Sequence, residues 1–220
     1  MGTVRNKMKI YLLDINKDMC DAWHRCFDPA TAGNIEIVNN SFAGFMSKHP
    51  GIEAIVSPAN SFGLMNGGYD KAITDYFGTG LMKTVQAKIL DKWLGLQPVG
   101  TSISVPIIDC ICYKDYKKAV TYHPILIHTP TMIAPESIID PSIVFHCMRS
   151  SIIEANNQGA SSIVIPAFGG CAGKLSFDTI AEMMKLAYLQ VFKPPIKLDW
   201  RYARHIHNLI MAVREGESAQ

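Results

Sequence analysis

Apolar residues fall in short runs and alternating patterns that mark six segments of the chain as β-strands. The clearest runs from Ser162 to Pro166 and is apolar at almost every position, as expected for a buried strand. Residues 109–119 are polar and carry several lysines, so we expect a connecting excursion there. The six predicted strands cover residues 8–13, 35–38, 52–57, 101–108, 122–128 and 162–166.

Between these strands, apolar residues recur every three or four positions, which is the pattern of helices with one buried face. Ser176 can cap one such helix, in which seven apolar residues from Phe177 to Val191 follow this spacing. Further helices are predicted over residues 18–27, 42–46, 69–77, 81–93, 140–158 and 198–213. Strands separated by helices predict a mostly parallel sheet that is covered by helices.

Composition limits the class of protein. With 220 residues, of which 48% are hydrophobic and 18% charged, the chain is long enough for one well-buried domain. The net charge is +2 and the basic residues are scattered, so we expect neither duplex nucleic acid nor a membrane as a partner. No apolar run reaches the roughly 18 residues of a membrane span, and no secretory segment is visible. We therefore expect a cytoplasmic or nuclear protein, and a monomer.

Six cysteines, none of them in a Cys-x-x-Cys pair, predict free thiols rather than disulfides. Cys110 and Cys112 can share one face of a strand, but no second pair lies at the spacing of a zinc site. His205 and His207 are two residues apart on a predicted helix, so they point in different directions and make a poor metal pair. We expect no metal and no cofactor.

Two predicted strands lead into glycine-rich loops. Strand 52–57 is followed by Asn60-Ser-Phe-Gly-Leu-Met-Asn-Gly-Gly-Tyr-Asp70, and strand 162–166 by Ala167-Phe-Gly-Gly-Cys-Ala-Gly-Lys174. In open α/β sheets, loops at the carboxyl ends of strands bind ligands, and a helix N-terminus behind such a loop favours anions. Glycine also keeps side chains out of the way of backbone N–H groups. A diphosphate is the ligand type that this arrangement suits.

Other interpretations of these loops are weaker. The first strand ends in Leu13-Asp-Ile-Asn-Lys-Asp18, which lacks the glycines of a Rossmann fingerprint. Gly173-Lys174 follows a strand as in a P-loop, but the first glycine of that motif would fall on Phe168 and its Ser/Thr on Leu175. Backbone amides around Cys171 favour a thiolate, but no partner base is identifiable, so filling space with a small residue is the better interpretation.

The first loop carries a resemblance to a known family. Ile52-Glu-Ala-Ile-Val-Ser-Pro-Ala-Asn60, followed after six residues by Gly67-Gly-Tyr-Asp70, resembles the macrodomain family, whose usual form is Asp-Ala-Ile-Val-Asn-Ala-Ala-Asn and then Gly-Gly-Val-Asp. Ile125-Leu-Ile-His128 and the second glycine loop are similar to other parts of that family. The resemblance covers most of the chain, residues 35–192.

This resemblance implies a three-layer α/β/α fold with a mixed, mostly parallel central sheet, to which the chain adds an N-terminal β-α unit and a C-terminal helix. We expect one domain over residues 1–220, with extensions at 1–34 and 193–220 that are atypical of the family and pack on its core. The resemblance also implies ADP-ribose, or a protein or small molecule that carries ADP-ribose, as the partner.

Matched residue by residue, the family pattern makes Asn60 and Asp70 a catalytic pair. Asn60 would hydrogen-bond the distal ribose, and Asp70 would position or activate water near the anomeric carbon. A structural interpretation competes for both, because Asn60 can build an Asx-turn and Asp70 favours the positive end of a helix. The residues expected to line the diphosphate and distal ribose are Asn66, Gly67, Gly68, Tyr69, Gly169, Gly170, Cys171, Ala172 and Gly173.

The adenine end departs from the family pattern. Family members usually have Gly-Asp-Ile-Thr, whose acid binds the adenine amino group, but the matching strand end here reads Asn39-Asn-Ser-Phe42. Asn40, Ser41 and Phe42 are therefore candidates for the adenine side, and Asp14 at the end of the first strand competes with them. In the second loop, Gly170-Cys171 replaces the usual Thr-Gly, which alters the distal phosphate contacts.

Three functions remain open. The first is a hydrolase that removes ADP-ribose from proteins or phosphate from ADP-ribose 1''-phosphate, with Asn60 and Asp70 in the active site. The second is a non-catalytic module that reads ADP-ribose. The third is a scaffold whose binding site has decayed.

Overall fold

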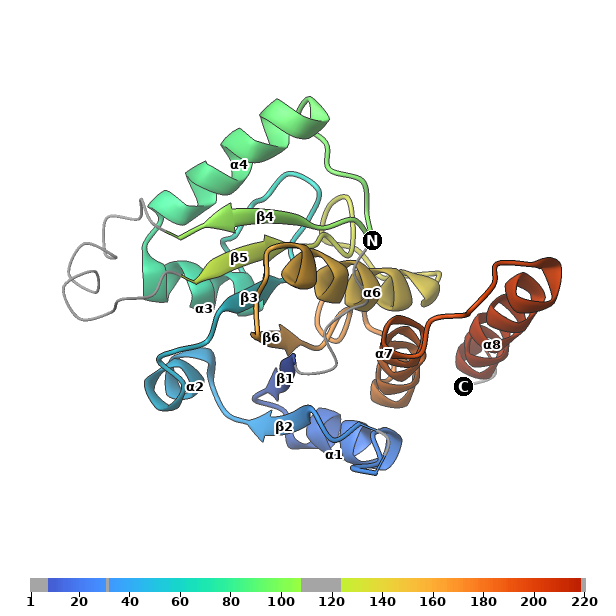
Figure 1. Ribbon diagram of the computed structural model, residues 1–220. Coiled ribbons are helices and arrows are strands. Elements are labelled where there is room, and N and C mark those ends of the chain that lie inside the picture. Colours follow the sequence, from blue (N-terminus) through green and yellow to red (C-terminus); the bar gives the residue numbers. More distant parts are fainter. Residues whose placement is uncertain (1–7, 31, 108–123, 219–220) are drawn as a thin grey trace.

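The computed structural model describes residues 8–30, 32–107 and 124–218, and the strands within these ranges form one six-stranded sheet (Figure 1). Neighbouring strands are parallel except β4 and β5, which pair antiparallel. In sheet order the strands are β2 (Ile35–Asn39), β1 (Lys9–Asp14), β6 (Ser162–Pro166), β3 (Ala54–Ser57), β5 (Ile125–His128) and β4 (Ile103–Pro106). The predicted mixed, mostly parallel sheet is confirmed.

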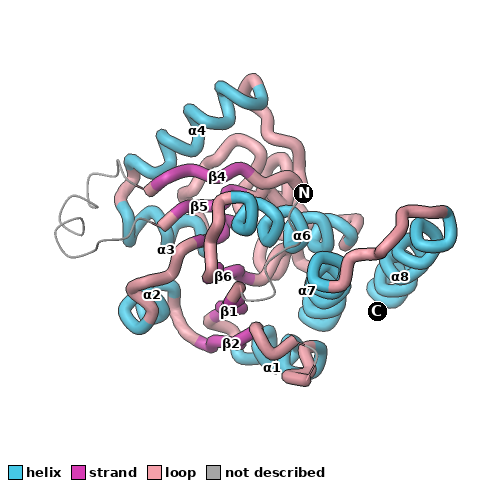
Figure 2. Tube along the Cα trace, in the orientation of Figure 1, coloured by secondary structure: helices cyan, strands magenta, loops and turns pink. Residues whose placement is uncertain are grey.

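Helices cover the sheet on both sides, as the tube in Figure 2 shows. One side carries α1 (Lys17–Cys26), α6 (Ser142–Asn157) and α7 (Phe177–Phe192), and the other carries α2 (Phe42–Lys48), α3 (Gly68–Phe77) and α4 (Gly80–Trp93). The C-terminal helix α8 (Trp200–Ser218) packs on α7 outside these layers. No helix in the described ranges is long and apolar enough to cross a membrane.

The alternation of side chains along each central strand supplies both cores. Ile163 and Ile165 of β6 belong to the core beneath α1, α6 and α7, whereas Val164 belongs to the core beneath α2, α3 and α4. All three side chains are completely buried. A strand that is buried on both faces must be apolar throughout, which is why these segments appear in the sequence as continuous apolar runs.

Several helix starts follow the expected capping chemistry. Ser176 accepts a hydrogen bond from the backbone N–H of Thr179 and caps α7 as predicted. Asp140 accepts one from the backbone N–H of Ser142 (3.0 Å) at the start of α6. Both contacts satisfy N–H groups that the first turn of a helix leaves free.

The observed elements differ from the predicted ones mainly at their ends. Within the described part of the predicted strand 101–108, regular pairing covers Ile103–Pro106, and the terminal helix begins at Trp200 rather than at residue 198. The predicted excursion 109–119, with Cys110 and Cys112, lies outside the described residues. The N-terminal unit does more than pack on a core, because β1 lies between β2 and β6 inside the sheet.

Candidate functional site

The candidate site lies along one edge of the sheet, where the carboxyl ends of the parallel strands meet. Asp14 ends β1, Ser57 ends β3 and His128 ends β5, while β6 between β1 and β3 leads into the second glycine loop. The first glycine loop follows β3. The fold thus brings both loops and the flanking polar residues to neighbouring strands, as expected for an open α/β sheet.

Asn60 organises the first loop. Its side-chain oxygen accepts hydrogen bonds from the N–H groups of Phe62 (3.1 Å) and Leu64 (3.3 Å), and its amide nitrogen donates to the Leu64 carbonyl (2.9 Å). This is the Asx-turn that the structural interpretation of Asn60 predicts. The side chain is nearly buried and retains one amide N–H beyond these contacts.

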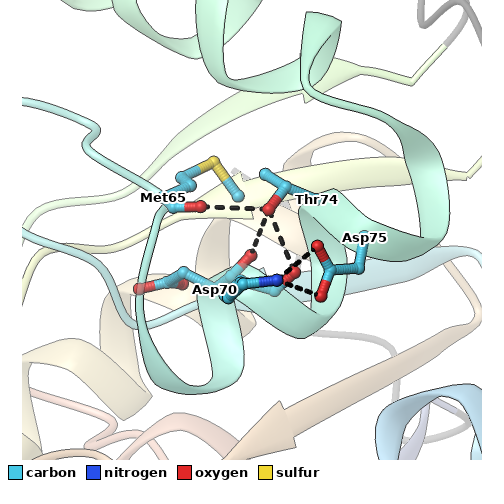
Figure 3. A network of polar contacts seen from close by, with 5 residues as sticks. Met65, Asp70, Thr74 and Asp75 are labelled. Atoms are coloured by element: carbon cyan, nitrogen blue, oxygen red, sulfur yellow. Dashed lines mark hydrogen bonds and ion pairs between the residues drawn. The ribbon is translucent and has the colours of Figure 1, made fainter.

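Thr74 ties the loop to helix α3. Its buried hydroxyl lies 3.0 Å from the Met65 carbonyl oxygen in the loop, and within its own helix 3.3 Å from the carbonyl of Asp70 and 3.0 Å from that of Lys71 (Figure 3). The Lys71 ammonium pairs with Asp75 one turn further along. The loop is therefore fixed at its start by Asn60 and at Met65 by Thr74.

The glycines of the first loop face open space. A Cβ atom built on Gly67 or on Gly68 would meet no atom within 4 Å. Gly68 has a φ of +54°, in the left-handed region that favours glycine, but Gly67 has a φ of −142°, which any residue adopts. Since neither packing nor backbone geometry requires glycine at 67, close approach of a ligand is the remaining physical reason for it.

Helix α3 begins at this loop without a side-chain cap. Its first N–H groups therefore have no side chain to satisfy them, and they carry the positive end of the helix dipole. An anion that approaches Gly67 and Gly68 would meet these groups directly.

Asp70 lies in the first turn of α3 and is partly buried. The hydroxyl of Ser57 donates a 2.6 Å hydrogen bond to its Oδ1 atom. Burial raises the pKa of Asp70 from 3.8 to about 7, although the hydrogen bond from Ser57 acts in the opposite direction. A carboxyl group with this pKa exchanges protons near neutrality, which is what a general base requires.

Tyr69 lies near enough to both acids of the site, Asp70 and Asp14, for their charges to act on its hydroxyl. Burial raises the pKa of its hydroxyl well above 10, and the charges of Asp70 and then Asp14 add to this effect. The ring packs edge-on against Phe42, with 5.5 Å between centroids. The buried hydroxyl finds no hydrogen-bond partner among the described residues. An unsatisfied buried hydroxyl is rare in folded proteins, and a ligand atom is one way to satisfy it.

The backbone of the second loop packs closely against itself. A Cβ atom on Gly173 would lie 2.6 Å from the Gly169 carbonyl oxygen, and the Gly173 carbonyl itself accepts from the N–H of Ile138 (2.9 Å). Gly169 has a φ of +83°. Gly170 is partly exposed, and Cys171 and Ala172 are exposed. Because Ser176 caps α7, this helix start is less available to an anion than that of α3.

The adenine-side candidates from β1 and β2 lie together. The Asp14 carbonyl oxygen accepts from the backbone N–H of Asn40 (3.1 Å), so the two strand ends adjoin. Asn40 and Ser41 use their side-chain oxygens locally, the first for the N–H of Ser41 (2.8 Å) and the second for that of Gly44 (3.1 Å). Burial raises the pKa of the Asp14 carboxyl group, and its Oδ1 atom accepts a hydrogen bond from the backbone N–H of Asn16 (2.8 Å). The last candidate at this end, Phe42, is buried.

His128 is linked to the first loop through the buried residue Gln97. Its Nδ1 atom lies 2.7 Å from Oε1 of the fully buried Gln97. Burial lowers the pKa of His128 to about 4, so the ring is neutral at pH 7 and Nδ1 donates to the amide oxygen. The backbone N–H of Gln97 donates to the Ser61 carbonyl (3.0 Å), which links this buried pair to the loop.

Sequence reasoning missed Ser57 and Gln97. Ser57 is the polar residue that closes the apolar run of β3, a signal that marks it as different from its neighbours. Gln97 lies in the connection between α4 and β4, and nothing in its local sequence distinguishes it. Within the described ranges, no group of three or more metal-ligating side chains gathers.

Comparison with known protein families finds one family that matches this chain. A family model described as "Macro-like domain" matches residues 32–174. This segment contains both glycine loops.

Solved structures give the same fold. The Oceanobacillus iheyensis macrodomain with ADP has a TM-score of 0.52 and 18% identity, over 75% of this chain and 86% of that one. A mutant of that macrodomain with ADPR has a TM-score of 0.51 and 18% identity, over 74% and 87%. The macrodomain of Mycobacterium tuberculosis DarG has a TM-score of 0.50 and 16% identity, over 64% and 83%.

Proposed function

This chain belongs to the macro-like domain family, and on that premise we propose that it binds ADP-ribose and hydrolyses ADP-ribosyl derivatives. The observation that carries the proposal is the order of polar groups along the carboxyl edge of β1, β6, β3 and β5. Four adjacent strands span about 14 Å at ~4.8 Å per step, which suits an extended nucleoside diphosphate sugar. Solved neighbours with ADP and with ADPR support this choice of ligand.

The diphosphate would lie over the first loop. Gly67 and Gly68 face open space, and the uncapped start of α3 offers its N–H groups and its dipole to an anion. The second loop follows β6, the strand next to β3. Its exposed part, from Gly170 to Ala172, would cover the diphosphate from that side.

Asp14 would bind the adenine amino group. Among the candidates at this end, Asn40 and Ser41 already use their side-chain oxygens for local N–H groups. A carboxylate has capacity for several donors, so Asp14 can accept from the amine while it holds the N–H of Asn16. Phe42 and Tyr69 would form the aromatic wall beside it.

Asp70 would act as the general base for the attack of water on the distal ribose carbon. Its pKa of about 7 leaves a substantial deprotonated fraction at neutral pH, and the hydrogen bond from Ser57 fixes its orientation. Asn60 would hold the distal ribose with its remaining amide N–H while its other contacts shape the loop. The substrate would be an ADP-ribosylated protein or ADP-ribose 1''-phosphate.

A non-catalytic reader of ADP-ribose is the second candidate, and the contacts of Asn60 favour it. Both lone-pair directions of its side-chain oxygen are taken by loop N–H groups, which leaves the residue less free to act on a substrate. A reader needs only the cradle formed by the loops.

Calorimetry with ADP-ribose, followed by product analysis, tests both candidates. The hydrolase predicts binding, and release of ADP-ribose from a modified protein or of phosphate from ADP-ribose 1''-phosphate. Binding of ADP-ribose without turnover of either substrate would support the non-catalytic binding module. Absence of heat even at millimolar ADP-ribose would contradict both functions and indicate a scaffold.

A further inference from the structure

Three apolar side chains protrude where the chain leaves α7. Ile196, Leu198 and Trp200 have exposed fractions of 108%, 82% and 78%. They occur at every second residue, two in the connection that leads into α8 and one at the first residue of that helix, which Figure 1 shows at the margin of the molecule. Single exposed apolar residues are normal on a protein surface, but three that protrude within five residues form a patch that needs an explanation.

Cations flank these side chains in the sequence. Residues 193–204, which we call the basic apolar patch, contain four of the 21 Lys and Arg residues of the chain and one acid, Asp199. None of the four pairs with an acid among the described residues. Asp199 accepts from the backbone N–H of Tyr202 (2.9 Å). The cations are Lys193, Lys197, Arg201 and Arg204, all of them exposed.

The patch lies at the opposite end of the molecule from the glycine loops. Helix α7 begins directly after the second loop and runs away from it for 16 residues, about 24 Å, before the patch begins. Helix α8 then returns along α7, and Arg214 near its end lies 3.8 Å from Asp140. Contacts made by the patch would therefore leave the candidate site open.

We propose that the basic apolar patch docks onto the surface of an anionic lipid membrane. Ile196, Leu198 and Trp200 enter the interfacial layer, and the four cations meet the lipid headgroups. Binding of this kind combines burial of apolar side chains with electrostatic attraction to anionic lipid. Tryptophan is enriched at this depth because its ring is apolar and its N–H is polar.

The shape of the patch favours a membrane over a macromolecular partner. Two of its apolar side chains protrude from an irregular segment and the third from the first residue of α8. A protein partner would need a matching pocket for each, whereas a fluid interface accepts them without a fixed complementary shape. Single-stranded nucleic acid would engage the cations and stack on Trp200, but Ile196 and Leu198 offer no aromatic face to a base. The net charge of +2 conceals this local concentration of cations.

Flotation of the full chain with lipid vesicles tests the proposal. We expect binding to vesicles of equimolar phosphatidylcholine and phosphatidylserine at low salt, and little binding to phosphatidylcholine alone. The variant Lys193→Glu/Lys197→Glu should lose about tenfold or more in partition to anionic vesicles, because it reverses two charges at the headgroups. The variant Ile196→Ser/Leu198→Ser/Trp200→Ser should lose as much.

Matched controls come from other exposed residues. Lys48→Glu/Lys83→Glu changes the same number of charges, and Leu94→Ser/Ile139→Ser removes apolar side chains that are each 93% exposed. Both controls should bind vesicles like the wild type, and circular dichroism should show every variant folded. Equal vesicle binding by all variants would overturn the proposal. So would binding to poly(U) RNA in the absence of vesicle binding, which would assign the patch to nucleic acid. The proposal stands independently of ADP-ribose binding.

Discussion

The Ser57 hydroxyl donates a 2.6 Å hydrogen bond to Oδ1 of Asp70 and so joins the end of β3 to the first turn of α3. This contact stabilises the carboxylate form of Asp70, while burial of the same group stabilises the neutral form and prevails. The pair therefore sets the pH range over which the candidate base works.

The raised pKa of Asp70 makes stability depend on pH. Between the unfolded value of 3.8 and the folded value of about 7, the folded protein binds more protons than the unfolded chain, so its stability falls as pH rises through this window. The loss above pH 7 is at most about 4 kcal/mol. In Asp70→Asn, the free energy of unfolding measured in urea should fall much less with rising pH than in the wild type. The asparagine side chain has nearly the same size and packing as aspartate but carries no charge at any pH. Asp75→Asn, exposed on the same helix, should retain the wild-type slope.

Ser57→Ala tests how this hydrogen bond tunes the base. Its removal should raise the pKa of Asp70, so the rise of kcat/KM with pH should move upward by as much as about one pH unit. Stability should fall by about 1 kcal/mol at neutral pH. A pH-rate profile identical to that of the wild type would mean that Ser57 has no influence on catalysis.

Tyr69→Phe removes a buried hydroxyl that has no partner among the described residues. If this hydroxyl donates to the bound ligand, the Kd for ADP-ribose should rise by about five- to tenfold, while thermal stability stays equal or increases. Tyr202→Phe is the matched control, because the Tyr202 hydroxyl is also buried without a partner but lies on α8. Affinity that is unchanged in both variants would exclude Tyr69 as a ligand contact.

Gly67→Ala and Gly173→Ala separate ligand approach from packing. A methyl group at 67 meets nothing within 4 Å, so stability should change by less than about 0.5 kcal/mol while ADP-ribose affinity falls more than about tenfold. A methyl group at 173 would lie 2.6 Å from the Gly169 carbonyl oxygen, and unfolding should become easier by about 1–3 kcal/mol. Thermal melts and calorimetry on both variants check this; a stable Gly67→Ala protein with full affinity would mean that the ligand does not approach there.

Much of the fold could be predicted because its central strands are buried on both faces. The short continuous apolar run at Ile163, Val164 and Ile165 is typical of a strand that is buried on both faces. The position of β1 could not be predicted in this way, because a run of apolar residues does not specify which strands lie beside it. Strand order depends on pairing between distant segments.

The candidate site was predictable where its residues are adjacent in the chain, as in the loop from Asn60 to Asp70. The contact from Ser57 to Asp70 crosses between two elements, and the pair of His128 and Gln97 joins residues that are 31 positions apart. Local sequence carries no signal for such contacts. The proposed preference for Asp14 over Asn40 likewise rests on the side-chain hydrogen bond of Asn40 to the N–H of Ser41, which the sequence does not show.

The insertion of β1 between β2 and β6 has a consequence for how the chain acquires its structure. β1 pairs on one edge with β2, which lies close to it in the chain, whereas its other edge pairs with Ser162 to Pro166, which lie opposite Lys9 to Leu13 and are synthesised much later. Such a long-range closure slows folding and leaves an aggregation-prone strand edge exposed in the meantime. Residues 32–174, although they match the family, lack a central strand and should not fold as an independent unit. Expression of that fragment alone should yield insoluble protein, whereas a boundary placed before Lys9 preserves the sheet.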